Sequence, residues 1–447
     1  MASTYLTRTF SSAGNRKTWT MSAWIKRSGL KSSSEDRVFG WKSGGGNYGF
    51  QFDNDAFNFY VCSGGSNAQF NTNRKFRDTS AWYHIVASCD TTQATQSDRF
   101  KLYINGVQET SFATGTYPNQ NEDTAVNQAE VCRLGCSTVA VNSHFSGLMS
   151  HVYFIDGTAL PASTFGSTDS TTGEWQINTS PTISSYGTNG FLVLKDGNTI
   201  TDQSPNSNNF TLGAGTLTFT HDNPSNVFCV LNAISGKSKP TLSIGNTKTG
   251  SSSDGNYVFG TIGSKAGYYE IKLGQNPNGG NGNGLTMGCY DSNYAETINS
   301  TAVRAFKTNH AYTVNYSVDD LGGGTSYEGT STGVSAAAGD IISVAWKNSK
   351  LYVAKNGTYF FSANPSNNTD GSTQVPLADS SAYQLPVSKS NVDGMTNSEW
   401  NFGNGYFGTT AITSNSGNGY QDANGQGKFQ YQPPTGCYAL CTKNLNV

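Results

Sequence analysis

The chain has 447 residues, which is too long for one hydrophobic core and long enough for two or three domains of ordinary size. Its 51 glycines and 12% aromatic residues, beside only 13% charged residues, are typical of strands and turns rather than helices. The 28 basic and 30 acidic residues nearly cancel, which disfavours nucleic acid as a partner because phosphate binding needs a sustained positive field.

Membrane insertion and secretion are also disfavoured. No run approaches the roughly 18 apolar residues that span a bilayer. The first eight residues lack the apolar core of a signal peptide. We therefore expect a soluble protein made in a cytoplasm, with its eight cysteines mostly as free thiols. Two CxxxC pairs, 132/136 and 437/441, lack the spacing and the nearby histidine of a strong zinc motif.

The first block of the chain alternates apolar and polar residues at the period of two that predicts strands. Asn105-Gly106 supplies the positive φ angles of a tight hairpin. The predicted strands are 19–25, 48–52, 57–61, 82–90, 100–107 (with the hairpin) and 148–155.

A Ser/Thr/Gly-rich stretch separates this block from the next. Its low apolar content predicts a connector over residues 161–224, with a short bridging hairpin formed by strands 191–194 and 217–220. The second block repeats the pattern of the first, and Asn356-Gly357 predicts another tight hairpin. Its predicted strands are 268–273, 285–289, 311–316, 341–346 and 350–360.

Several segments resemble known families. Residues 82–86 (WYHIV), residues 101–106 (KLYING) and the strand over 147–156 resemble laminin-G-like, concanavalin A-like jelly rolls across residues 1–160. Residues 267–271 (GYYEI), 339–346 (GDIISVAW) and 351–357 (LYVAKNG) look like a SPRY domain. The expected fold is all-β: two concanavalin-like antiparallel sandwiches at 1–160 and 225–410, the connector at 161–224 and a C-terminal extension at 411–447.

The combination of these segments, with residues 5–8 (YLTR), 12–20 (SAGNRKTWT) and 433–436 (PPTG), is similar to virion proteins of tailed phages, especially marine ones. The resemblance implies a surface protein of the particle, assembled in the host cytoplasm. Its expected partners are other virion proteins and a host-surface glycan or protein, and a homo-oligomer is a reasonable expectation for such appendages.

Motifs for catalysis are weak. Residues 329–333 match GxSxG but lie in a Gly/Ser/Thr-rich stretch that predicts a loop, not the strand-turn-helix of a nucleophile elbow. No segment shows the spaced glutamate pair of a glycosidase strand. The five histidines form no metal motif, so hydrogen-bonded strand or loop positions are expected for them: His84, His144, His151, His221 and His310.

Calcium is the one cofactor that the sequence leaves open. Asp202, Ser204, Asn206 and Asn208 alternate like the start of a calcium loop, although Asx turns explain the same residues. Laminin-G-like folds often hold calcium at a sandwich rim, and the resemblance makes three acids candidates for such a site: Asp53, Asp55 and Asp90.

Aromatic residues in polar loops are the usual platform for sugar rings. Six tyrosines at or near predicted loops are candidate ligand-binding residues: Tyr48, Tyr117, Tyr290, Tyr294, Tyr327 and Tyr406. Taken with the resemblance to phage virion proteins, these residues favour a non-enzymatic host-surface adhesin, with a capsid or tail decoration protein as the alternative and a polysaccharide-degrading enzyme as a minor one.

Overall fold

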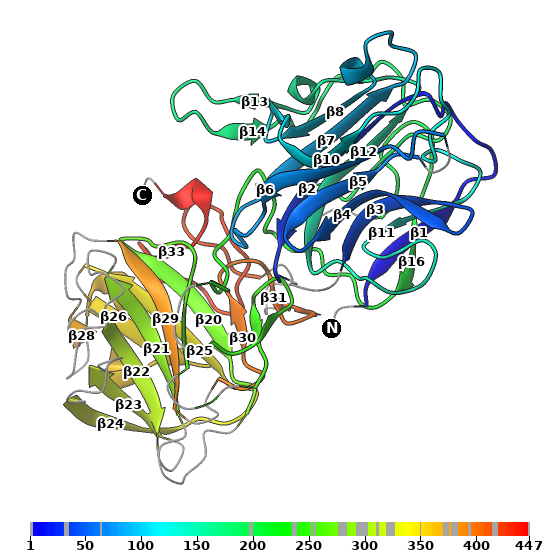
Figure 1. Ribbon diagram of the computed structural model, residues 1–447. Coiled ribbons are helices and arrows are strands. Elements are labelled where there is room, and N and C mark those ends of the chain that lie inside the picture. The colour runs from blue at the N-terminus through cyan, green and yellow to red at the C-terminus, as the bar shows by residue number, and fades with distance from the viewer. Residues whose placement is uncertain are drawn as a thin grey trace. The chain divides into compact units, whose positions relative to one another are not determined.

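The structure is an all-β protein of two compact units, formed by residues 1–219 with 223–225 and by residues 220–222 with 226–447 (Figure 1). Among the described residues, helical structure is confined to short 3-10 turns, and no helix has the length and apolarity to cross a bilayer. This computed structural model describes residues 3–30, 35–62, 65–195, 200–234, 239–251, 253, 256–275, 284–291, 303–309, 313–318, 327–348, 350–369, 375–376, 383–391, 395–413 and 419–445.

Two antiparallel sheets form the first unit. The eight-stranded sheet has the order β10-β6-β5-β4-β3-β11-β1-β16, with bounds β1 Tyr5–Thr9, β3 Asp36–Ser43, β4 Gly46–Asp53, β5 Ala56–Tyr60, β6 Gln69–Lys75, β10 Phe112–Thr116, β11 Val131–Leu134 and β16 Thr211–Ala214. The six-stranded sheet has the order β15-β12-β2-β7-β8-β9, with bounds β2 Thr18–Arg27, β7 Tyr83–Asp90, β8 Phe100–Ile104, β9 Val107–Gln108, β12 Gly147–Asp156 and β15 Phe191–Val193.

The core between these sheets is largely aromatic. Phe50 and Phe52 of β4 pack with Phe57 of β5 at ring-centroid distances of 5.3 and 5.7 Å. Trp41 of β3 meets Phe154 of β12 across the core at 4.4 Å. Because side chains alternate along a strand, the residues before and after each core aromatic lie on the opposite face of the sheet. The hairpin prediction at Asn105-Gly106 is confirmed by φ values of 47° and 78°.

A segment that follows β12 covers the outer face of the six-stranded sheet. This first cover, residues 158–190, contains 3-10 turn η2 (Ala162–Thr164) and the hairpin of β13 (Gly166–Thr168) and β14 (Trp175–Ile177), drawn beyond β8 in Figure 1. Its Phe165 packs in one buried cluster with Val86 of β7 and Tyr153 of β12. The sheet is therefore buried on both faces, and β2 has almost no exposed residue.

The second unit also contains two sheets. The described strands of one sheet are β17 Leu242–Ser243, β18 Lys248–Thr249, β20 Gly267–Lys272, β25 Ile341–Lys347, β26 Lys350–Lys355, β27 Thr358–Tyr359, β28 Val375–Pro376, β30 Glu399–Asn401 and β33 Tyr438–Ala439. Those of the other, in the order β19-β29-β21-β22-β23-β24, are β19 Tyr257–Phe259, β21 Gly284–Asp291, β22 Val303–Asn309, β23 Thr313–Val318, β24 Tyr327–Ser335 and β29 Gln384–Asn391.

The remaining described elements are small. They are the pair β31 Tyr406–Phe407 and β32 Thr410–Ala411, and the 3-10 turns η1 Gln96–Asp98, η4 Phe360–Ser362, η5 Pro365–Asn367 and η6 Thr442–Asn444. The Asn356-Gly357 hairpin prediction is confirmed by φ values of 48° and 84°.

The end of the chain covers the second unit as residues 158–190 cover the first. In this second cover, residues 419–445, Phe429 packs edge-on against Tyr268 of β20 at 4.9 Å. The carboxylate of Glu270 is fully buried beneath it and accepts hydrogen bonds from the backbone N–H groups of Gln430 (3.0 Å) and Tyr431 (2.8 Å). A buried carboxylate on the sheet thus fastens the cover.

These covers change the predicted domain boundaries. Residues 161–224 are not a free connector: β15 pairs with β12, and β16 pairs with β1. Residues 411–447 are not a separate extension, since β33 pairs with β20. The predicted strand at 217–220 is wrong; the strand lies at β16, and its register is set by pairing with β1, a contact between residues about 200 apart in sequence.

Candidate functional site

The outer face of the eight-stranded sheet carries a row of polar side chains. Arg37 of β3 lies opposite Gln51 of β4, Gln51 lies opposite Asn58 of β5, and Asn58 lies opposite Asn71 of β6. Gln51 separates two core phenylalanines, 50 and 52, so its side chain points away from the core. We call Arg37, Gln51, Asn58 and Asn71 the polar row.

Several atoms of the polar row are buried and have no hydrogen-bond partner in the part of the chain that the structure describes. They are Nη1 of Arg37, Oε1 of Gln51, Nδ2 of Asn58 and Oδ1 of Asn71. Gln51 is fully buried and Asn58 is 5% exposed. An unpaired buried polar group costs about 1–3 kcal/mol, and such groups are rare in folded proteins. Four of them on adjacent strands indicate a place where a polar ligand or water completes the structure.

Glu35 and Tyr60 border the row. The Arg37 guanidinium donates from Nε (3.1 Å) and Nη2 (2.7 Å) to Oε2 of Glu35, and Gln51 donates to Oε1 of Glu35 at 3.3 Å. The Arg37 guanidinium also lies 5.9 Å from the ring centroid of Tyr60 on β5. It therefore reaches diagonally from β3 across β4 towards Tyr60, which lies opposite Gly49. Burial raises the pKa of the Tyr60 hydroxyl, and Arg37 acts in the opposite direction.

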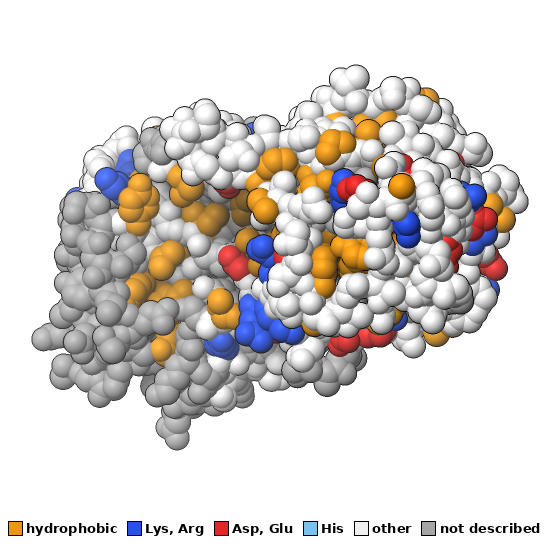
Figure 2. Space-filling model, turned by 45° about the horizontal axis from the view of Figure 1, so that its top comes forward, with side chains coloured by type: hydrophobic (Ala, Val, Ile, Leu, Met, Phe, Trp, Pro, Cys, Tyr) orange, Lys and Arg blue, Asp and Glu red, His pale blue; other side chains and the backbone are white. Residues whose placement is uncertain are grey.

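Charge on the surface is sparse and mixed. On the face drawn in Figure 2, the coloured charged side chains stand in small groups of both signs, separated by uncharged surface. This agrees with the composition and leaves hydrogen bonding and packing, rather than long-range attraction, as the means of recognising a ligand.

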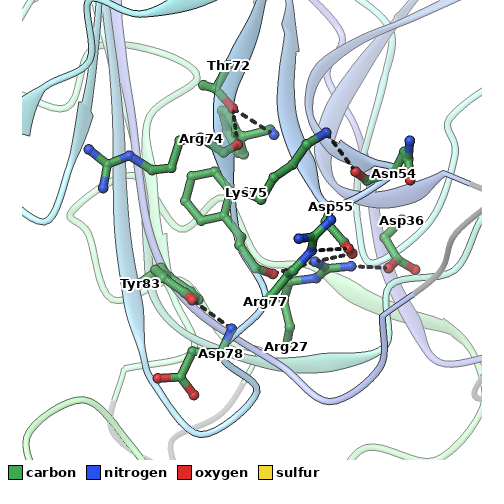
Figure 3. A network of polar contacts seen from close by, with 12 residues as sticks. Arg27, Asp36, Asn54, Asp55, Thr72, Arg74, Lys75, Arg77, Asp78 and Tyr83 are labelled. Atoms are coloured by element: carbon green, nitrogen blue, oxygen red, sulfur yellow. Dashed lines mark hydrogen bonds and ion pairs between the residues drawn. The ribbon is translucent and has the colours of Figure 1, made fainter. Parts of the chain in front are cut away.

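A second polar network lies between the two sheets of the first unit and serves their packing (Figure 3). Arg27 of β2, 1% exposed, donates from Nη1 to Asp55 (3.0 Å) and to the carbonyl of Phe76 (2.6 Å). Its Nη2 lies 3.5 Å from Asp36 of β3, and Arg77 donates to the other oxygen of Asp55 at 3.1 Å. Arg27 thereby links both sheets at one end of the core.

The predicted tyrosines do not form one site. Tyr48 and Tyr290, expected at loop edges, lie within β4 and β21 and are only 8% and 4% exposed, so their rings have no open face for stacking. Alternation along β4 turns Tyr48 into the core. Tyr290 lies on the face of β21 opposite to the core residues Met287 and Cys289, and its ring is covered by Phe259 at 5.1 Å. Tyr117 is partly buried against Phe70 (4.9 Å), and Tyr406 begins β31, half-buried. Tyr327 begins β24, and Tyr294 lies outside the described residues.

In the loop of candidate calcium residues, the carboxylate oxygens of Asp202 accept hydrogen bonds from the protein itself. Asp202 accepts hydrogen bonds from the backbone N–H groups of Leu192, Ser204 and Asn208 and from the Ser204 hydroxyl, at 2.7–2.9 Å. The Asx-turn interpretation of this loop is therefore confirmed.

The three rim acids are also separated. Asp90 lies beside Thr18 at one end of β2, whereas Asp55 bonds Arg27 at the other end, and Asp53 is exposed at the end of β4. The part of the chain that the structure describes holds no cluster of three or more His, Cys, Asp or Glu side chains suited to a metal ion.

The other sequence motifs are structural. All eight cysteines are buried free thiols. The GxSxG motif lies within β24 rather than in the predicted loop, so it has no elbow geometry. His84 is a hydrogen-bonded strand residue, as predicted: Trp175 of the first cover donates to its Nδ1 at 3.0 Å, and its Nε2 lies 2.9 Å from the Ser22 hydroxyl. His310 lies outside the described residues.

Sequence reasoning missed the polar row because it searched for aromatic loop residues. A signal was present: Gln51 and Asn58 each stand between two phenylalanines, in FQF and FNF. Such a residue must face away from the core. That these polar residues share one row across four strands depends on the sheet register, which the sequence does not show.

A family model matches a large part of the first unit. Residues 2–164 match the Laminin_G_3 family of the concanavalin A-like lectin/glucanases superfamily. No curated protein matches the chain. Similar solved structures include domains LG4-5 of the mouse laminin alpha1 chain (8% identity, 89% of this chain, 84% of that chain, TM-score 0.28) and a putative carbohydrate binding protein from Bacteroides ovatus (13%, 48%, 57%, 0.31). The first unit has the concanavalin A-like lectin fold, with residues 2–164 similar to the laminin-G type.

Proposed function

We propose that this protein is a non-enzymatic binding protein whose first unit binds a glycan on the outer face of the eight-stranded sheet. The observation that carries the proposal is the polar row, in which four buried polar atoms on adjacent strands lack partners. The lectin-type fold of this unit is consistent with such a role.

The chemistry of the row suits a sugar. Each hydroxyl group of a saccharide can both donate and accept a hydrogen bond, and the row offers donors and acceptors side by side. The half-buried ring of Tyr60 beside the row could pack against the apolar face of a pyranose. The unpaired atoms are out of contact with solvent, so a ligand can reach them only if side chains beside the row move, and the Arg37 side chain, which lies near Tyr60, is one that borders the row.

Binding fits this face better than hydrolysis. A glycosidase holds two carboxyl groups on either side of the scissile bond. The carboxylate that touches the row, Glu35, is bonded by both Arg37 and Gln51. Release of reducing ends from a bound polysaccharide would instead support the degrading-enzyme alternative.

The test measures glycan binding of the purified full chain on an array of immobilised bacterial polysaccharides, compared with two variants of the row. Asn58→Leu removes an unpaired polar atom at nearly constant volume, so it should leave stability unchanged or slightly higher. Gln51→Met removes an unpaired oxygen but also the 3.3 Å hydrogen bond to Glu35, so it should cost no more than about 1 kcal/mol. Affinity should fall by about tenfold or more, equivalent to about 1.4 kcal/mol. Gln176→Leu, at an exposed residue of the first cover, is the matched control. No binding by the wild type, or equal binding by all variants, contradicts the proposal.

We further propose that the protein is displayed on a phage particle and binds a host-surface glycan or envelope protein. The resemblance to tailed-phage virion proteins supports this placement, and the SPRY-like resemblance of the second unit supports a second binding module. The alternative is a decoration protein that contacts other virion subunits. Gold-labelled antibody on purified particles tests the placement: label at the tail supports an adhesin, label over the head supports decoration, and unlabelled particles contradict both.

A further inference from the structure

The unpaired polar atoms of the polar row alternate between hydrogen-bond donors and acceptors from strand to strand. Nη1 of Arg37 on β3 is a donor, and Oε1 of Gln51 on β4 is an acceptor. Nδ2 of Asn58 on β5 is again a donor, and Oδ1 of Asn71 on β6 is again an acceptor. A hydroxyl lying between two neighbouring strands can donate to one side chain and accept from the other.

This alternation opposes an anionic ligand. A carboxylate or sulfate accepts hydrogen bonds only, so it would leave Gln51 and Asn71 without a donor and place its charge beside their oxygens. The row holds one guanidinium, that of Arg37, and Glu35 already bonds two of its nitrogens. The Glu35 carboxylate, 40% exposed, both compensates the positive charge and repels an approaching anion.

The length of the row sets the size of the ligand. Adjacent strands lie about 4.8 Å apart, so four strands place the first and last residues about 14 Å from each other. This distance exceeds one pyranose ring. Engaging the whole row requires an extended saccharide that runs across the strands.

We infer that the glycan bound by the polar row is a neutral oligosaccharide or polysaccharide segment and that Glu35 excludes acidic glycans. This inference rests on the proposed function and specifies the class of ligand at the same site. Its physical basis is the alternation of donor and acceptor atoms and the compensation of the Arg37 charge by Glu35.

The experiment uses matched pairs of immobilised polymers that differ in charge: dextran with dextran sulfate, and methyl-esterified polygalacturonate with polygalacturonate. The full chain should retain at least one neutral member with an affinity at least about tenfold above its acidic counterpart. Binding should change little between about 0.1 M and about 1 M salt, because no charge attraction is screened.

Two variants sharpen the result. Asn58→Asp replaces the unpaired donor Nδ2 with an acceptor oxygen and should weaken binding of the neutral polymers by about tenfold. Glu35→Gln, at a partly exposed residue, frees the Arg37 guanidinium and should raise the retention of polygalacturonate by about tenfold. This gain cannot arise from misfolding, so it tests the inference even if Asn58→Asp fails to fold.

Preferential, salt-sensitive retention of the acidic polymers by the wild type would overturn the inference and leave the glycan-binding proposal standing. An unchanged charge preference in Glu35→Gln would also overturn it. Absence of retention on all four polymers, together with a blank polysaccharide array, would overturn the proposed function itself and the inference with it.

Discussion

Arg27 donates from Nη1 to Oδ1 of Asp55 at 3.0 Å, and this pair joins the two sheets of the first unit. The guanidinium also lies 4.5 Å from the ring centroid of Phe52, so the ion pair caps the aromatic core. A charge in this position is removed from water almost completely. Its partners therefore matter far more than those of a surface pair.

Replacing Arg27 with Met should destabilise the first unit by about 1–3 kcal/mol, because buried Oδ1 of Asp55 and the carbonyl of Phe76 lose the donor that Arg27 supplies. Hydrogen exchange followed by mass spectrometry measures this change in peptides of each unit separately. The control is Asp123→Asn, which removes an exposed partner 3.9 Å from Arg16 and should change stability by less than about 1 kcal/mol. Equal effects from the two substitutions would show that the buried pair has no special role.

Trp175→Phe should loosen the first cover. The substitution keeps an aromatic ring but removes the N–H that donates to the buried Nδ1 of His84, at a cost of about 1–2 kcal/mol. Backbone exchange in residues 158–190 should accelerate more than exchange in β2, since the cover opens without the core. Gln176→Leu, the next residue of β14, serves as the control, and uniform acceleration across the unit would contradict a local role.

Acid should weaken the first unit through His84. Burial, with a smaller effect of His151, lowers the pKa of His84 from 6.5 to about 3. Below pH 6.5, His84 therefore binds a proton in the unfolded chain but stays neutral in the folded unit until the pH approaches 3. The stability contributed by neutral His84 is full above pH 6.5 and falls by up to about 1.4 kcal/mol per pH unit towards pH 3. His84→Gln should flatten this dependence in denaturant titrations read from first-unit peptides, and an unchanged slope would exclude His84 as its source.

Glu270 should give the second unit the opposite dependence. Burial raises its pKa from 4.5 to about 7, although its hydrogen bonds act against the rise. The folded unit thus holds a proton that the unfolded chain releases above pH 4.5. Stability should be greatest below pH 4.5 and fall as the pH rises to about 7, by at most about 1.4 kcal/mol per unit.

Glu270→Gln should remove this pH dependence and also lower stability at every pH. An amide nitrogen in place of Oε2 would face the donors of Asn401 and Gln430, leaving two buried N–H groups unpaired at about 1–3 kcal/mol each. Exchange of the peptides covering 428–445 at pH 4.5 and at pH 7, corrected for intrinsic rates, measures both effects. A variant that keeps the wild-type pH profile would assign the titration to another group.

Strand positions were predictable where the signal is local. The alternation around Phe50, Phe52 and Phe57 predicts strands because each strand buries one face, and Asn-Gly predicts the hairpin at residue 105 because both residues adopt positive φ. These properties depend on neighbours within a few residues. The all-β class and the presence of two sandwich units followed from them.

The covers and the polar row depended on contacts that only the folded chain makes. Residues 161–190 resemble a connector because they contain few apolar residues. In the folded chain, however, Phe165 and Trp175 pack on the outer face of the six-stranded sheet, and the sequence pattern does not indicate that this face is covered. Gln51 and Asn58 become neighbours through strand register, which is set by pairing across the whole sheet. Local alternation reports which face a side chain takes, and tertiary packing decides what lies against that face.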